Sequence, residues 1–317
     1  MFTADPSAHV FDDKIYIYPS HDIPHEGEDN DNGDEYQMRD YHVLSMDSLE
    51  SECKDNGLAL SEGDVPWVSS QMWAPDVAFV GGKYHLFFPA RDKDGIFRLG
   101  VASSESPTGP FKPEPEYIKG SYSIDPAVLV DDDGKVFVYY GGLWGGQLEK
   151  WITGTYDPDA PFSPDPDPEA DALGPMCAVM DGNMKEFATE PVMLKILDEN
   201  GVPLKAKDED RRYFEGPWMH KYNGKYYLSY STGTTHYIVY ATSDSPMGPF
   251  TYRGRIMEPV LGWTTHHSIV EYKGKWYLFH HDSVPSGGKS WLRSLKVCEL
   301  EYDADGRIKT IEGIDKE

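Results

Sequence analysis

The sequence predicts an all-β protein folded as a five-bladed β-propeller, and one repeated unit carries that prediction. Each unit has a strand-like run, a tight turn ending in lysine, and a second strand rich in aromatic residues. Gly-Gly, Asp-Gly and Asn-Gly in three of the turns supply the positive φ that two-residue hairpins require. The five hairpins are expected at residues 8–18, 77–88, 127–140, 218–230 and 268–280.

The segments that follow two of the hairpins resemble each other as well. Residues 99–111 follow the second hairpin and residues 238–250 follow the fourth, and each predicts a third strand with an outer edge strand. About four strands per unit is typical of a propeller blade. A β-sandwich is the alternative, but it does not require the same hairpin five times. We therefore expect residues 1–317 to form a single propeller domain.

Two polar insertions interrupt the repeat. Residues 22–34 are acidic and residues 157–171 are rich in proline and aspartate, so both are expected to form long surface loops. The first insertion does not match an EF-hand, because aligning Gly33 with the invariant glycine puts Arg39 where the bidentate glutamate belongs. The HExxH, Walker A, GxGxxG and GxSxG motifs are absent, which argues against zinc protease, nucleotide-binding and serine hydrolase chemistry.

The composition excludes several classes of partner. The chain has 54 acidic residues against 29 Lys and Arg, a formal net charge of −25, which disfavours nucleic acid and anionic membranes. An aromatic content of 13% excludes an acidic disordered chain. No apolar run is long enough to cross a bilayer, and no signal peptide precedes the first strand. A cytoplasmic location is expected for the chain as it stands, and a periplasmic or secreted one if a leader has been trimmed.

The three cysteines do not form the pattern of a disulfide framework. Cys53, Cys177 and Cys298 are widely spaced and odd in number, so we expect reduced or buried thiols and neither disulfides nor a metal site. The oligomeric state cannot be inferred from the sequence.

Three acids lie just before or at the first strand of different units. Asp5 lies in Ala4-Asp5-Pro6, Asp125 in Ile124-Asp125-Pro126, and Glu215 in Glu215-Gly216-Pro217. The first strand of each blade lines the central axis, so equivalent positions converge at one end of the channel. Each acid alone is typical of a turn, but their recurrence at one register in three blades favours a functional site.

Such acids are suited to glycoside hydrolysis. In an inverting enzyme one carboxylic acid protonates the leaving oxygen while an ionised one, about 6.5–9.5 Å away, activates water. A third acid can keep the pKa of the proton donor high.

These segments, together with Trp73-Ala74-Pro75-Asp76, resemble glycoside hydrolase family 43, the arabinofuranosidase and β-xylosidase family. The resemblance covers nearly the whole chain and implies a five-bladed propeller that hydrolyses with inversion. It implies that Asp5 is the general base, Asp125 the pKa modulator and Glu215 the general acid.

The resemblance implies two further site residues. Arg293 resembles the arginine that binds the sugar in the innermost subsite. His266 stands where family members often place a histidine that ligates a structural calcium or other ion in the axis. Here Thr265 replaces the family's glycine and His267 follows directly, so a hydrogen-bonded histidine without metal is the alternative.

Aromatic side chains are expected to complete a sugar pocket. Trp73 and Phe214 flank site positions, and Trp144 lies in a glycine-rich loop that could cover the opening. The alternative for each is packing between blades. His280 and His281 are expected to be structural, and the sequence assigns no role to the adjacent His21 and Asp22.

The function expected from these features is that of an exo-acting glycoside hydrolase, with the two insertions walling a pocket for one terminal sugar. The expected substrate is an oligosaccharide or polysaccharide, with terminal α-L-arabinofuranosyl residues removed from arabinan or arabinoxylan. A β-xylosidase of the same family and a non-catalytic glycan-binding propeller are the alternatives. No cofactor is required for the chemistry, and a structural calcium in the axis is possible.

Overall fold

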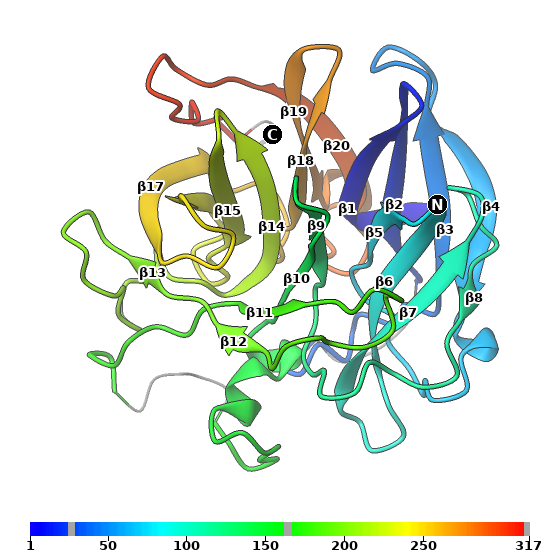
Figure 1. Ribbon diagram of the computed structural model, residues 1–317, viewed down its shortest axis with the longest axis horizontal. Coiled ribbons are helices and arrows are strands. Elements are labelled where there is room, and N and C mark those ends of the chain that lie inside the picture. Colours follow the sequence, from blue (N-terminus) through cyan, green and yellow to red (C-terminus); the bar gives the residue numbers. More distant parts are fainter. Residues whose placement is uncertain (25–28, 162–166, 314–317) are drawn as a thin grey trace.

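A computed structural model describes residues 1–24, 29–161 and 167–313, and the strands in this part of the chain form five sheets that are antiparallel except for one short pair (Figure 1). The five predicted hairpins are the first two strands of the five sheets. Parts of both insertions, residues 25–28 and 162–166, lie outside the described residues.

Blades one and two have four strands each, as the repeat predicts. Blade one comprises β1 (Phe2–Phe11), β2 (Lys14–Asp22), β3 (Asp40–Met46) and β4 (Lys54–Ser61). Blade two comprises β5 (Asp76–Val80), β6 (Lys83–Arg91), β7 (Phe97–Ser104) and β8 (Lys112–Pro113).

Blade three also has four strands, whereas blades four and five vary this plan. Blade three comprises β9 (Ala127–Val130), β10 (Val136–Tyr140), β11 (Met176–Val179) and β12 (Val192–Met193). Blade four comprises β14 (Glu215–Tyr222), β15 (Lys225–Ser231), β16 (Ile238–Ser243) and β17 (Phe250–Met257), and β13 (Ile196–Leu197) pairs in parallel with β17. Blade five has β18 (His267–Tyr272), β19 (Lys275–Asp282) and β20 (Ser294–Leu300).

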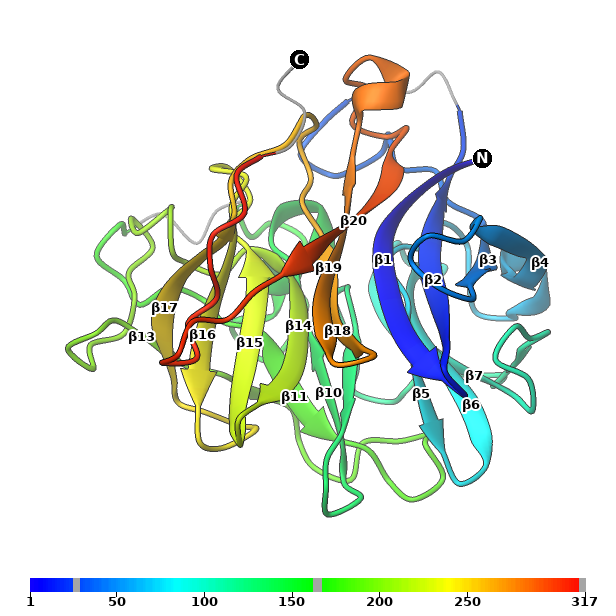
Figure 2. The same ribbon diagram turned by 90° about the horizontal axis from the view of Figure 1, so that it is seen from above.

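The inner strands close the ring. β1 contacts β5, β5 contacts β9, β9 contacts β14, β14 contacts β18, and β18 returns to β1. The last blade therefore lies beside the first, as Figure 2 shows for β18 to β20 and β1. The predicted five-bladed propeller is confirmed.

Helical structure is confined to short 3₁₀ turns in the described residues: η1 (Glu62–Asp64), η2 (Trp144–Gly146), η3 (Leu148–Trp151) and η4 (Val284–Ser286). No helix in this part of the chain is long and apolar enough to cross a membrane. The three cysteines are free thiols, as expected: Cys177 is buried, Cys298 half-buried and Cys53 exposed.

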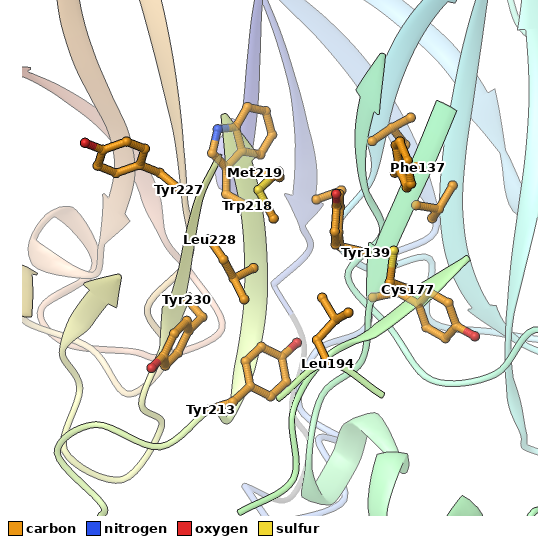
Figure 3. Close-up of a cluster of buried hydrophobic side chains, with 14 of the residues drawn as sticks. Phe137, Tyr139, Cys177, Leu194, Tyr213, Trp218, Met219, Tyr227, Leu228 and Tyr230 are labelled. Atoms are coloured by element: carbon orange, nitrogen blue, oxygen red, sulfur yellow. The ribbon is translucent and has the colours of Figure 1, made fainter. Parts of the chain in front are cut away.

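The hydrophobic core lies between neighbouring blades. The largest cluster joins blades three and four and includes Tyr139, Cys177, Trp218 and Leu228 (Figure 3). Other clusters join blade one to blade two and blade one to blade five. Alternation along the strands turns one face of each sheet toward the next blade, so the aromatic-rich second strands are buried on both sides.

One buried carboxylate ties three blades together near the axis. Asp76 of β5 accepts hydrogen bonds from the backbone N–H of Val128 at 2.6 Å and of Val77 at 2.7 Å. It also contacts His9 Nε2 at 2.6 Å and the hydroxyl of Ser7, both on β1. Asp76 therefore links the inner strands of blades one, two and three.

Candidate active site

A pocket of about 110 Å³ opens where the inner strands begin, and all eight residues predicted for the site line it. They come from every blade or from the segment just before it: Asp5, Trp73, Asp125, Trp144, Phe214, Glu215, His266 and Arg293.

The backbone at three of these positions is unusual. Asp5, Asp125 and Gly216 each precede a proline, and their φ angles are +50°, +57° and +62°. The register of β1 shifts between Ala4 and Ser7. Positive φ is uncommon for aspartate, and such residues gather at functional sites.

The same register shift occurs in β14, between Glu215 and Trp218. Gly216 is therefore the equivalent of Asp5 and Asp125, whereas Glu215 is the equivalent of Ala4. The three acids were predicted at equivalent positions of their blades. This was wrong for Glu215, which lies one residue before the position equivalent to Asp5 and Asp125. The bulge still brings all three into one pocket because it re-aims the side chains around it.

Asp5 is held as a carboxylate. Ser20 Oγ donates to its Oδ2 at 2.6 Å, and Arg293 Nη1 donates to its Oδ1 at 3.0 Å. Burial alone would raise the pKa of Asp5, but Arg293, His281 and His266 together lower that pKa to about 2. Asp5 is therefore ionised at any pH at which the protein would work.

Glu215 has the opposite environment. Burial, and then the negative charge of Asp5, raises the pKa of Glu215 to about 8, against a smaller opposing effect of Arg293. The carboxyl is therefore protonated at neutral pH. Two carboxyls in one pocket whose pKa values are driven apart are the arrangement that acid–base catalysis requires.

Asp125 lies between the other two acids. Burial raises its pKa, followed by the charges of Glu215 and Asp5. The backbone N–H of Gly216 donates to Asp125 Oδ2 at 3.0 Å, which favours the ionised form. Burial and the repulsion among these carboxylates make it costly for Asp125 and Glu215 to be ionised together, so the pair retains a proton at neutral pH. The backbone donor at Asp125 favours its location on Glu215.

Arg293 is buried and organises Asp5. Its Nε and Nη2 donate to the two oxygens of Asp22 at 3.0 and 2.8 Å, and Nη1 donates to Asp5 and to Thr264 Oγ1. A guanidinium has five donor hydrogens, so these four bonds leave one for a ligand. The Tyr36 ring lies 5.0 Å from the guanidinium carbon.

His281 fixes the backbone at Asp5. The N–H of Asp5 donates to His281 Nδ1 at 3.0 Å, and His281 Nε2 lies 3.0 Å from the carbonyl oxygen of Thr264. Burial lowers the pKa of His281 to about 3, so the ring is neutral, with its proton on Nε2. The expected structural role of His281 is therefore exercised directly on the predicted base.

Aromatic rings form two walls of the pocket. Trp73 packs on Phe97 at 4.6 Å between ring centroids, and its Nε1 donates to the carbonyl of Tyr36. On the other wall the ring of Trp144 lies 5.2 Å from Phe214 and 5.7 Å from Trp263. Both carboxylate oxygens of Glu149 accept a hydrogen bond from the Trp144 backbone N–H.

Several lining or supporting residues were not predicted, and four of them make contacts that the site depends on. Asp22, Tyr36 and Trp263 act through contacts between distant parts of the chain, and Thr264 hydrogen-bonds Arg293. Trp263 lies three residues before His266, which is the one local signal that could have identified it.

The two insertions differ in their relation to the pocket. Residues 29–31, 33 and 35 of the first insertion and its flank line the pocket, as expected. The described residues of the second insertion, 157–161 and 167–171, do not line it. The expectation that both insertions wall the site is therefore supported for the first one alone.

His266 offers a limited site for an ion. Its Nδ1 lies 3.7 Å from Asp5 Oδ1 and 3.9 Å from Asp125 Oδ2. Within the described residues it belongs to no group of three converging imidazole, thiolate or carboxylate ligands. Calcium takes six to eight oxygen ligands, so these residues fit an ion held mainly by water.

Comparison with known proteins agrees with this geometry. The family model for glycosyl hydrolases family 43 matches residues 1–160 and 178–308. The chain is 61% identical to "Xylosidase/arabinosidase 43A" of Humicola insolens, over 98% of this chain and 97% of that protein. It is 58% identical to "Xylosidase/arabinosidase" of Bacteroides ovatus, over 99% of this chain and 96% of that protein.

Solved structures give the same result. This chain superimposes with a TM-score of 0.97 on the structure of CoXyl43, a GH43 β-xylosidase/α-arabinofuranosidase from a compost microbial metagenome. That structure is a complex with xylotriose in a calcium-free form. It is 61% identical and covers 98% of this chain and 95% of that one. The GH43_1 enzyme from Xanthomonas citri complexed with xylotriose gives a TM-score of 0.93 at 51% identity, and the match covers 100% of this chain and 93% of that one. The sequence, the propeller and the acid pocket thus agree, and the chain belongs to glycosyl hydrolase family 43.

Proposed function

We propose that this chain is an exo-acting, inverting glycoside hydrolase that releases single terminal pentoses, both β-xylosyl and α-L-arabinofuranosyl, from plant oligosaccharides. The observation that carries the proposal is that Asp5 and Glu215 line one pocket in opposite environments: Arg293 and Ser20 donate to Asp5, whereas Glu215 is buried near the negative charge of Asp5. The names of the relatives, which cover both sugars, support the substrate class.

In the proposed reaction Glu215 is the general acid. It donates its proton to the glycosidic oxygen as the bond to the anomeric carbon breaks. Asp5 is the general base and takes a proton from a water molecule that attacks the opposite face of the sugar. Asp125 holds the segment that carries Glu215 by accepting the Gly216 N–H, and Arg293 orients Asp5 while its remaining N–H is available to a sugar hydroxyl.

The size of the pocket supports exo action. A volume of about 110 Å³, closed by Trp144 and Trp263 on one side and by residues 29–35 on another, suits one sugar ring better than a long chain. Stacking of sugar C–H faces on these rings would orient the terminal residue.

A divalent ion at His266 is compatible with the proposal and is not required by it. A close relative was solved in a form described as calcium-free. When bound, a mainly hydrated ion there would add positive charge near Asp5 and Asp125.

The test measures hydrolysis of p-nitrophenyl β-D-xyloside, p-nitrophenyl α-L-arabinofuranoside and xylotriose by the wild type and by Asp5→Asn. The proposal predicts turnover of both aryl glycosides, free xylose and xylobiose as the first products from xylotriose, and loss of these activities in Asp5→Asn. Binding of xylotriose without turnover by the wild type would support the glycan-binding alternative instead.

A further inference from the structure

We propose a second site, distinct from the sugar pocket, at which His21, Asp40 and His42 bind a first-row transition metal of the zinc type. His21 lies near the end of β2, and the other two lie at the start of the adjacent β3. One potential ligand atom from each residue lies within 4.8 Å of the others. It is the one such trio found among the described residues.

The ligand chemistry selects the metal. Two imidazoles and a carboxylate suit zinc, cobalt or nickel, whereas calcium and magnesium prefer oxygen ligands alone. Tetrahedral zinc holds its ligand atoms about 3.3 Å apart, given Zn–N distances of about 2.0–2.1 Å. The side chains must therefore shift to reach this spacing, and His21 Nδ1 and Asp40 Oδ1, which lie 2.6 Å apart, must separate slightly. With exposed fractions of 22%, 24% and 21%, they have the freedom to do so.

The hydrogen bond of His42 already matches that of a metal ligand. His21 Nδ1 lies 2.6 Å from Asp40 Oδ1, and His42 Nδ1 lies 3.0 Å from Asp55 Oδ1. The carboxylate of Asp55 on Nδ1 fixes the tautomer of His42 and leaves its Nε2 to bind metal, as in carboxylate–histidine–zinc sites. The rings lie 5.3 Å apart at an angle of 63°. Asp55 thus acts as the orienting partner of His42, and a metal would replace the proton between His21 Nδ1 and Asp40 Oδ1.

The place of this trio in the fold gives the metal a role. The segment that joins β2 to β3 supplies Gly33, Tyr36 and Met38 to the sugar pocket. His21 and Asp40 stand at its two ends, and Asp22, next to His21, is bound to Arg293. A metal that joins β2 to β3 would therefore hold the base of this pocket wall. The inference of a clasp for the wall depends on the proposed function, whereas the metal site itself does not.

The direct test is isothermal titration of the full-length protein with zinc chloride after treatment with a chelator, in excess calcium to occupy any axial site. The wild type is expected to bind one zinc ion that the variant His21→Gln/His42→Gln does not bind. His85→Gln, which changes a half-buried histidine on β6 of blade two, is the matched control and should bind zinc like the wild type. Asp55→Asn should weaken the affinity about 10–100-fold.

Two further measurements do not depend on activity. Cobalt(II) should give visible absorption bands typical of bound imidazole in the wild type and the control. Saturating zinc should raise Tm by about 2 °C or more in the same two proteins and leave the double variant unchanged. Equal zinc affinity in the wild type and a double variant that is folded by circular dichroism would overturn the site. So would a wild type that binds no zinc.

The role as a clasp has its own readout. With zinc bound, hydrogen exchange in peptides that cover residues 29–42 should slow in the wild type and not in the double variant. The KM for xylotriose should fall by about twofold or more. Zinc binding without either change would overturn the clasp and leave the site intact.

Discussion

Replacing Glu215 by glutamine gives the most informative prediction for the proposed chemistry. Glutamine keeps the shape of the side chain but has no proton to donate. With a pKa of about 8, Glu215 is about 99% protonated at pH 6 and about half protonated at pH 8. The wild-type kcat/KM should therefore fall about tenfold per pH unit above pH 8, and Glu215→Gln should lose that alkaline limb.

The size of the loss depends on the leaving group. A general acid contributes about 10²–10⁴-fold, so Glu215→Gln should lower kcat for xylobiose by that factor. The dinitrophenolate group of a dinitrophenyl xyloside leaves without being protonated. The kcat of Glu215→Gln for this substrate should therefore be less than about tenfold below that of the wild type. Measuring kcat for both substrates from pH 5 to pH 10 checks both points. Equal losses on the two substrates, or an alkaline limb that survives the substitution, would refute the assignment of Glu215 as the acid.

The other predictions concern stability, each measured by thermal unfolding. The pKa of Glu215 is raised in the folded state, so the contribution of its protonated form to stability declines between about pH 4.5 and pH 8. Glu215→Gln should therefore raise Tm relative to the wild type at pH 8.5 and have little effect at pH 4. A difference in Tm that stays constant with pH would contradict this. Asp22→Asn breaks the buried pair with Arg293 and should cost about 3–5 kcal/mol, whereas Asp47→Asn, at an exposed ion pair, should cost less than about 1 kcal/mol. Asp76→Ala leaves two buried backbone N–H groups without their acceptor and should cost about 2–6 kcal/mol with an unchanged KM; a smaller loss or a changed KM would contradict its role as a link between blades.

The propeller was predictable because its signals are local. Each hairpin turn determines its own two strands through residues that tolerate positive φ, and the repeat alone counts the blades. The three acids were found in the same way, from their place before or at the inner strands. The one-residue offset of Glu215 can be read from the sequence, because the proline that directly follows Asp5 and Asp125 follows Gly216 in the fourth unit.

The partners of the acids were less accessible to sequence analysis. Arg293 meets Asp22 across 271 positions in the chain, a contact that depends on closure of the ring between blades one and five. Tyr36 lines the pocket from the segment just after the first insertion, which has no regular strand pattern. Such contacts depend on tertiary packing, and no spacing in the sequence reports them.

The most direct test of the central claim, that Asp5 and Glu215 act as base and acid in an inverting reaction, is the stereochemistry of the product. Proton NMR during hydrolysis of p-nitrophenyl β-D-xyloside resolves the two anomers of xylose before they interconvert. If Asp5 and Glu215 have these roles, α-xylose appears first and the β anomer forms later by mutarotation. Initial release of β-xylose would show retention, and the proposed roles of the two carboxyls would be wrong.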